Sequence, residues 1–210
     1  MNRTKIYIKK TVKFIRELSV VVIGIAITVS VGLWINNINN KKDLNLYLDA
    51  IKLELEKNIE DHDKELVILQ RSVDYANYLR ANDKKSLNAD TIDNYINAYY
   101  TTQVNKNKTN AFEMFKLSGI MRLMNDKELL LSIWEAYTFM DESKILAEIG
   151  LQFKIEEIKK ELPLIAAGKK DFIPMYTYYT ATDWAYDMHR LCQETSEILK
   201  ETVLKLENRR

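Results

Sequence analysis

The sequence contains few of the residues that interrupt helices. Its 210 residues include only five glycines and two prolines. A chain with so few turn-forming residues is expected to consist of long helices joined by few connections. Two of the glycines lie in one apolar run. We expect the helices to end or bend at the other breakers, which are Gly119, Gly150, Pro163, Gly168 and Pro174.

Cysteine and histidine are also scarce, and their scarcity excludes several classes of protein. The single cysteine, Cys192, rules out an internal disulfide framework and any zinc site built from several cysteines. Phosphate-binding loops, dinucleotide-binding glycine motifs, nucleophile elbows and zinc-protease motifs are missing as well. We therefore expect no enzyme activity, no cofactor and no metal site.

The net charge of the chain is only +1, but positive residues gather at its N-terminal end. The rest of the chain has no clustered lysines and arginines of the kind that bind nucleic acid, so we expect no nucleic-acid partner. The first sixteen residues contain no acid and six basic residues, namely Arg3, Lys5, Lys9, Lys10, Lys13 and Arg16.

An uncharged apolar run follows, over residues 18–35. A helix of this length spans about 27 Å, close to the ~30 Å hydrocarbon core of a bilayer. Trp34 lies at its end, where an indole favours the membrane interface. A cleaved signal peptide, cut after Ser30 and Gly32, is the alternative. Its apolar core is normally only about 7–15 residues long, so we favour a transmembrane helix.

The basic residues before this run predict its orientation. Because positive residues are retained in the cytoplasm, residues 1–17 are expected to form a cytoplasmic tail and residues 36–210 a domain outside it. Within the run, Gly24, Thr28 and Gly32 recur at every fourth position, which lets two spanning helices approach closely. The sequence therefore predicts a membrane protein with a helix suited to forming homo-oligomers, although such stripes also arise by chance.

The domain that follows has the pattern of an all-α fold. Apolar residues recur at steps of three and four, as on the buried face of a packed helix. Asn110 and Asn125 each lie three residues before a glutamate, Glu113 and Glu128, as a residue that caps the start of a helix does. Gly119 between the two pairs marks the end of a helix. We expect an antiparallel helical bundle with two long helices (about 43–80 and 126–167), a C-terminal helix (about 182–207) and short helices near 91–100 and 111–118.

A segment rich in aromatic residues, 168–181, connects the second long helix (about 126–167) to the C-terminal helix (about 182–207). If one long helix leaves the membrane and the other returns, this segment lies near the bilayer surface. Tyr176, Tyr178 and Tyr179 then either sit at the membrane interface or cap the core of the bundle. The second alternative is the favoured one.

Two groups of residues are candidates for a chemical site, one for a metal ion and one for an activated thiol. Asp61, His62 and Asp63 resemble a metal cluster, but adjacent helical residues point about 100° apart and cannot converge on one ion. Glu65, three residues from His62, is better placed to share a metal ion with it. The favoured interpretation is nevertheless a seam histidine, that is, one at the contact between two helices and hydrogen-bonded to the neighbouring helix. His189 and Cys192 are also three apart, and an imidazole can activate a thiol. A small buried Cys192 is favoured over a nucleophile.

Patches of the sequence between residues 16 and 140 resemble a known family. They are REL at 16–18, VIGIAI at 22–27, WINN at 34–37, YLDAIKLELEKN at 47–58 and AFEMFKLSGIMRLMNDKEL at 111–129, with Tyr137 beyond. The family is one of small single-span inner-membrane proteins of Gram-negative bacteria, and its domain has no known function. The resemblance implies an inner-membrane anchor and a helical periplasmic domain, and it supplies no catalytic residue. Met121, Met124 and Trp134 depart from the family pattern, which affects packing only.

These observations favour two functions. The first is a membrane-anchored helical interaction or scaffold protein, which binds itself or a protein partner outside the cytoplasm. The alternative is a ligand-sensing helical bundle. Its discriminating feature would be an output domain, and because the cytoplasmic tail is too short to be one, a partner protein would have to carry the signal.

The small-residue stripe yields a direct prediction. Replacing Gly24 or Gly32 by leucine places a bulky side chain where two helices would meet, so any dimer seen in mild detergent should be lost. Crosslinking of the purified full-length chain measures this. Unchanged dimerisation in both variants would remove the stripe as an association surface.

Overall fold

A computed structural model gives the fold over residues 2–95, 106–167 and 173–209. The side chains of residues 2–25, 27, 32–37, 165 and 166 lie outside this description. All regular structure in the described residues is helical, which confirms the all-α fold class. The chain divides into two compact units, Met1–Leu46 and Tyr47–Arg210.

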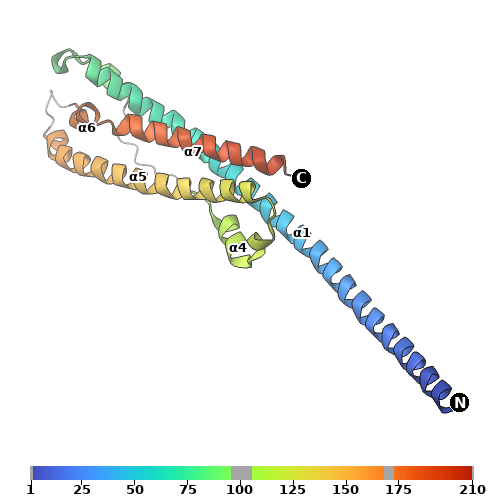
Figure 1. Ribbon diagram of the computed structural model, residues 1–210. Helices are drawn as coiled ribbons and strands as arrows, with labels where there is room; N and C mark the ends of the chain where they lie inside the picture. The colour runs from blue at the N-terminus through green and yellow to red at the C-terminus, as the bar shows by residue number, and fades with distance from the viewer. Residues whose placement is uncertain (1, 96–105, 168–172, 210) are drawn as a thin grey trace. The chain divides into compact units, whose positions relative to one another are not determined.

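The helices follow the sequence pattern closely. The predicted helices near 111–118, 126–167 and 182–207 are confirmed, while residues 96–100 of the one expected near 91–100 lie outside the described part. One short helix, α6, was not predicted. The helices are α1 (Asn2–Ala81), α2 (Ala89–Asn94), α4 (Asn110–Ser118), α5 (Lys127–Ala166), α6 (Tyr176–Ala181) and α7 (Trp184–Glu207), with 3-10 turns at Lys84–Ser86 and Ile120–Leu123 (Figure 1).

The first unit contains the beginning of α1. Among the described residues, no helix combines the length and the apolarity needed to cross a membrane. The span predicted over residues 18–35 falls mostly on positions whose side chains lie outside the description, including Gly24, Gly32 and Trp34. Thr28 is exposed. The transmembrane helix and its packing stripe therefore stay predictions.

The second unit is built around three helices that lie side by side, α1 from Tyr47 onward, α5 and α7 (Figure 1). Helix α7 is antiparallel to α1, as two contacts show. The Lys200 ammonium lies 2.9 Å from the Asp63 carboxylate, and Tyr186, earlier on α7, donates its hydroxyl to Asn77, later on α1.

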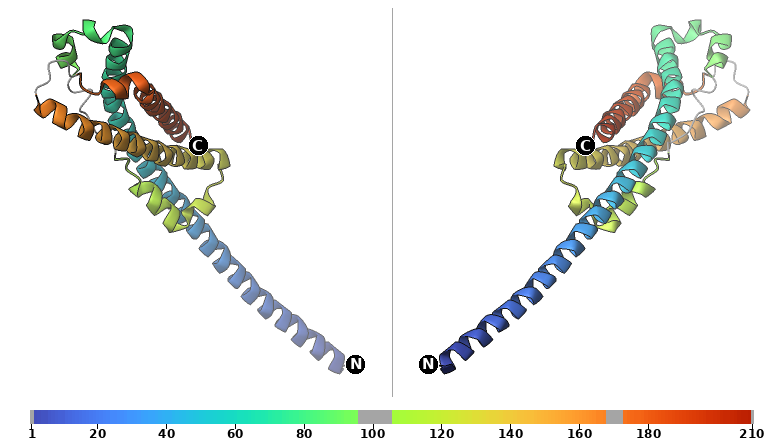
Figure 2. Two further views of the ribbon diagram at one scale, coloured as in Figure 1. Left: turned by 90° about the vertical axis from the view of Figure 1, so that its left-hand side faces the viewer. Right: turned by 90° about the vertical axis from the view of Figure 1, so that its right-hand side faces the viewer.

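Helix α5 runs in the same direction as α1, which differs from the expected arrangement of the long helices. Tyr137 of α5 donates to Glu54, and Asn58, one turn later on α1, contacts Met140, one turn later on α5. The reason is where the described parts of the connection lie on α1. Asn88 is bonded to Tyr78 near the end of α1, whereas Lys108 is bonded to Asn58 nearer its start, so α5 begins beside the early part of the unit (Figure 2). The expectation that the second long helix returns towards the start of the first is wrong. Residues 173–181 therefore lie beside Tyr75–Arg80 rather than beside Tyr47.

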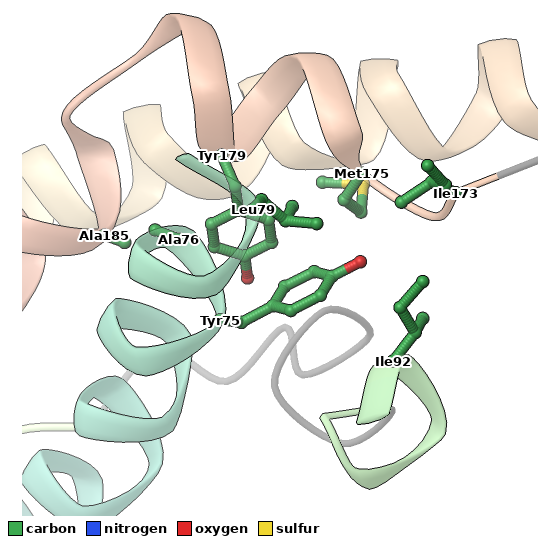
Figure 3. Close-up of a cluster of buried hydrophobic side chains, with 8 residues drawn as sticks. All are labelled: Tyr75, Ala76, Leu79, Ile92, Ile173, Met175, Tyr179 and Ala185. Atoms are coloured by element: carbon green, nitrogen blue, oxygen red, sulfur yellow. The ribbon is translucent and has the colours of Figure 1, made fainter. Parts of the chain in front are cut away.

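The described part of the aromatic segment, residues 173–181, packs over the core at this end of the bundle. The ring of Tyr179 is buried and meets that of Tyr75 edge-on, with centroids 5.1 Å apart. The Tyr75 hydroxyl donates to the carbonyl of Pro174 at 2.8 Å. Tyr176 and Tyr178 are partly buried against the same cluster. Figure 3 shows the buried side chains of this cluster converging: Tyr75, Ala76, Leu79, Ile92, Ile173, Met175, Tyr179 and Ala185. A membrane contact of the three tyrosines stays a prediction.

A buried carboxyl group holds the unpredicted helix α6 in place. Met175, immediately before α6, has a left-handed φ of 56°, a conformation that side chains other than glycine rarely adopt. Its backbone N–H donates to Oε1 of Glu161 at 2.6 Å. Burial raises the pKa of Glu161 to about 7. Six residues rich in tyrosine and threonine have little intrinsic tendency to form a helix, so α6 depends on this tertiary contact.

The start of α4 is also fixed by a distant carboxylate. Glu54 of α1 accepts the backbone N–H groups of Ala111 at 2.8 Å and Phe112 at 3.3 Å, together with the hydroxyl of Tyr137 at 2.6 Å. Asn110, the predicted capping residue, is the first residue of the helix instead, so that prediction is wrong.

Of the other residues predicted at helix boundaries, Gly119 is confirmed and Asn125 is not. Gly119 ends α4 with a left-handed φ of 70°, as expected. The cap of α5 is Asp126 rather than Asn125, because the Asp126 side chain accepts the N–H of Leu129 at 2.9 Å. Pro163 lies inside the last turn of α5, which ends at Ala166.

Glu54→Gln should destabilise the second unit. The variant keeps the shape but replaces one acceptor oxygen by an NH₂ donor facing other donors, which costs on the order of 1–3 kcal/mol in unfolding free energy. Urea unfolding of the full chain in mild detergent, followed by circular dichroism, measures the change. Glu56→Gln, two residues away, is the control. Its side chain is 41% exposed and pairs with Lys52 on the same helix, so this change should shift the unfolding free energy by less than about 0.5 kcal/mol. Equal effects of the two variants would contradict this role of Glu54.

Candidate functional site

A cavity of about 100 Å³ lies in the second unit, walled by α1, α5, α6 and α7. A space of this size holds a few water molecules or a small chemical group. Its apolar wall includes Leu69, Leu151, Trp184, Met188 and Leu191. Its polar and titratable lining is unusual for a helical core and includes His62, Glu65, Lys154, Tyr178, Tyr179 and Cys192.

His62 of α1 is held in one tautomer by its neighbours. The Asn107 side chain donates to the carbonyl of Met140 at 3.1 Å, which directs its amide oxygen towards His62. The Nε2 atom of His62 lies 3.2 Å from that oxygen and therefore carries the proton. Burial lowers the pKa of His62. The imidazole is thus neutral, and its Nδ1 lone pair faces Cys192 of α7, whose Sγ lies 3.5 Å away.

Cys192 and Glu65 complete a cluster with His62. The thiol of Cys192 lies 3.5 Å from the carbonyl oxygen of His62 and 4.0 Å from Oε2 of Glu65. Burial raises the pKa of Cys192 to about 12 and that of Glu65 to about 7. Because the thiol of Cys192 is not readily ionised, it is not an activated nucleophile.

A buried lysine lines the same cavity from α5. The ammonium of Lys154 donates to the hydroxyl of Tyr179 at 3.3 Å and lies 5.8 Å from the centre of the same ring. Burial lowers the pKa of Lys154 to about 8. The cavity therefore contains both an acid and a base whose charged forms are weakly solvated, which is the environment of a binding site more than of a packed core.

Gly150 allows the cavity wall to close around an indole. A Cβ at this position would lie 3.2 Å and 3.4 Å from two ring atoms of Trp184 and 3.7 Å from the sulfur of Met188. The absence of a side chain at Gly150 thus lets α5 and α7 approach at the start of α7.

The sequence predicted the burial of single residues at this site, but it did not predict which of them meet. His62 is a buried seam histidine with partners on other segments, as expected. Asp61 and Asp63 point elsewhere, to Lys108 and Lys200. The partner of Cys192 is His62 rather than His189.

The convergence of His62, Glu65 and Cys192 was not predicted. The cysteine is 130 residues from the histidine, and nothing local links the two. The available signals were the three-residue spacing of His62 and Glu65 and the position of Cys192 on the apolar side of its helix.

Comparison with other proteins adds no family. No protein-family model, no curated protein and no solved structure matches the chain significantly.

Filling the cavity wall should move Trp184. Gly150→Leu forces the indole away from α5, so its emission should shift to longer wavelength as the ring becomes more exposed. The measurement uses full-length protein in which Trp34 and Trp134 are replaced by phenylalanine. Gln152→Leu, which adds leucine at an exposed position two residues away, should leave the emission unchanged. An unshifted spectrum in Gly150→Leu would contradict the close packing at Gly150.

Proposed function

We propose that the protein is a membrane-anchored interaction protein whose helical domain binds a helix of a partner protein through one face of α5. The supporting observation is a set of large apolar side chains left exposed on successive turns. Ile145, Leu146, Ile149 and Phe153 are 57, 43, 43 and 55% exposed. Soluble proteins rarely expose contiguous apolar side chains of this size unless a partner covers them.

The spacing of these residues suits a helical partner. Ile145, Ile149 and Phe153 are each four apart, and Leu146 lies beside them, so all four occupy one side of α5 over about 12 Å. An amphipathic helix packs on such a stripe by inserting its own apolar residues between successive turns. The proposed partner therefore supplies the apolar face of a helix.

Membrane anchoring is the second part of the proposal, and the sequence supports it. The uncharged run 18–35 and the six basic residues before it favour an anchor with residues 1–17 in the cytoplasm and 36–210 outside. The resemblance to single-span proteins of the bacterial inner membrane favours the same topology, with the helical domain in the periplasm. The helix stripe at Gly24, Thr28 and Gly32 would then add self-association within the membrane.

The cavity favours a second candidate, a ligand-sensing bundle that signals through a partner. Gly150 lines the cavity, and Ile149, the preceding residue, is exposed on the apolar face of α5. A ligand that moved this turn would alter both surfaces at once. The partner surface and the sensor are therefore compatible in one molecule.

A pull-down of the tagged full-length chain from its native membranes tests the partner surface. Ile149→Glu places a charge in the centre of the stripe, and recovery of a companion protein should fall at least tenfold. Val67→Glu is the matched control, because Val67 is an exposed apolar residue on α1, and recovery should equal that of the unaltered chain.

Two outcomes would contradict the proposal. A companion retained equally by Ile149→Glu would exclude the α5 face as the binding surface. Recovery of the tagged chain in the soluble fraction rather than in membranes would exclude the anchor.

A further inference from the structure

We propose that His62, Glu65 and Cys192 bind a zinc ion whose fourth coordination position opens into the cavity. The three side chains offer one nitrogen, one oxygen and one sulfur ligand, all within 4.8 Å of one another. This inference does not depend on the partner surface of α5, since its three ligands lie on α1 and α7.

The spacing of the ligand atoms fits a tetrahedral ion. Zinc bonds of about 2.0–2.3 Å place neighbouring ligand atoms about 3.5 Å apart in a tetrahedron. The distance from Nδ1 of His62 to Sγ of Cys192 is 3.5 Å, and that from Sγ to Oε2 of Glu65 is 4.0 Å. The ligand atoms of His62 and Glu65 lie within 4.8 Å of each other, so a movement of the Glu65 carboxylate by about 1 Å would bring all three atoms onto one ion.

The fold prepares the histidine as a ligand. A metal-binding imidazole usually donates its second N–H to an oxygen that fixes the tautomer and the ring orientation. Asn107 does this for Nε2 of His62, and Asn107 is itself oriented by the carbonyl of Met140. A histidine that only fills space does not need this support. Here Asn107 and the Met140 carbonyl hold the ring so that Nδ1 faces the thiol of Cys192.

The ligand set selects zinc over harder ions. Thiolate and imidazole ligands suit zinc, whereas magnesium and calcium require oxygen ligands in larger number. On binding, the thiol and, where protonated, the carboxyl group release their protons to solvent. A zinc ion with one thiolate and one carboxylate then leaves a buried site of zero net charge.

Three protein ligands are too few for a purely structural site. Structural zinc sites normally have four protein ligands, while three with an open position are typical of sites that bind water or a further ligand. The cavity of about 100 Å³ borders all three residues and provides room for such a fourth ligand. Any small molecule with a thiolate, imidazole or carboxylate group could take that position from water.

Cobalt(II) titration of the metal-free full-length protein in mild detergent tests the site. Cobalt takes the same geometry as zinc, and a bound thiolate gives a sulfur-to-cobalt charge-transfer band together with intense visible bands. We expect one equivalent to bind with both features, and one equivalent of zinc to abolish them. Absence of the charge-transfer band in the unaltered chain would overturn the proposal without recourse to any variant.

Conservative variants assign the ligands. Cys192→Ser should remove the charge-transfer band, and Glu65→Gln should weaken binding at least tenfold. His189→Gln and Glu60→Gln are controls on the same two helices and should bind as the unaltered chain does. Circular dichroism verifies that each variant is folded. A band that persists in Cys192→Ser, or that is lost in His189→Gln, would overturn the assignment, while the pull-down with Ile149→Glu reports on the partner surface separately.

Discussion

Three polar side chains on one face of α1 set the arrangement of the second unit. Glu54, Asn58 and His62 occur at four-residue steps and point into the bundle, where each requires hydrogen-bond partners. Glu54 accepts from the start of α4, the buried Asn58 exchanges two bonds with the backbone of Lys108, and His62 meets Asn107. An apolar face would tolerate several packings, whereas these groups accept only one register of the returning segment.

That register determines the direction of α5. Residues 106–112 are bound along α1, so α5 begins beside the early part of the second unit and must run the same way as α1. Helix α7 then returns against both of them. The buried hydroxyl groups of Ser143 on α5 and Thr195 on α7 lie 2.8 Å apart. The cavity lies where polar groups from these helices meet, and its lining follows from the same register.

Much of this fold could be read from the sequence, but only where the signal was local. Helix periodicity and Gly119 gave the boundaries of α4, α5 and α7 to within two residues. The cap at Glu54 could not be foreseen, because the carboxylate is 57 residues from the N–H it accepts. Helix α6 and the direction of α5 are likewise products of tertiary contacts. At the site, the seam role of His62 was predictable from its position in the helix, whereas its meeting with Cys192 required the fold.

The pairing of α1 with the end of the chain has a consequence for biosynthesis. Asp49 and Lys52, near the start of the second unit, are paired with Arg209 and Glu207. At ~5–20 residues per second, the ribosome needs on the order of ten seconds to make the intervening chain. During that interval the apolar face of α1, with Leu48, Ile51 and Leu55, has no α7 to cover it. The newly made chain must therefore be shielded from aggregation until its last helix emerges, and truncation near the C-terminus would expose the first part of the bundle rather than the last.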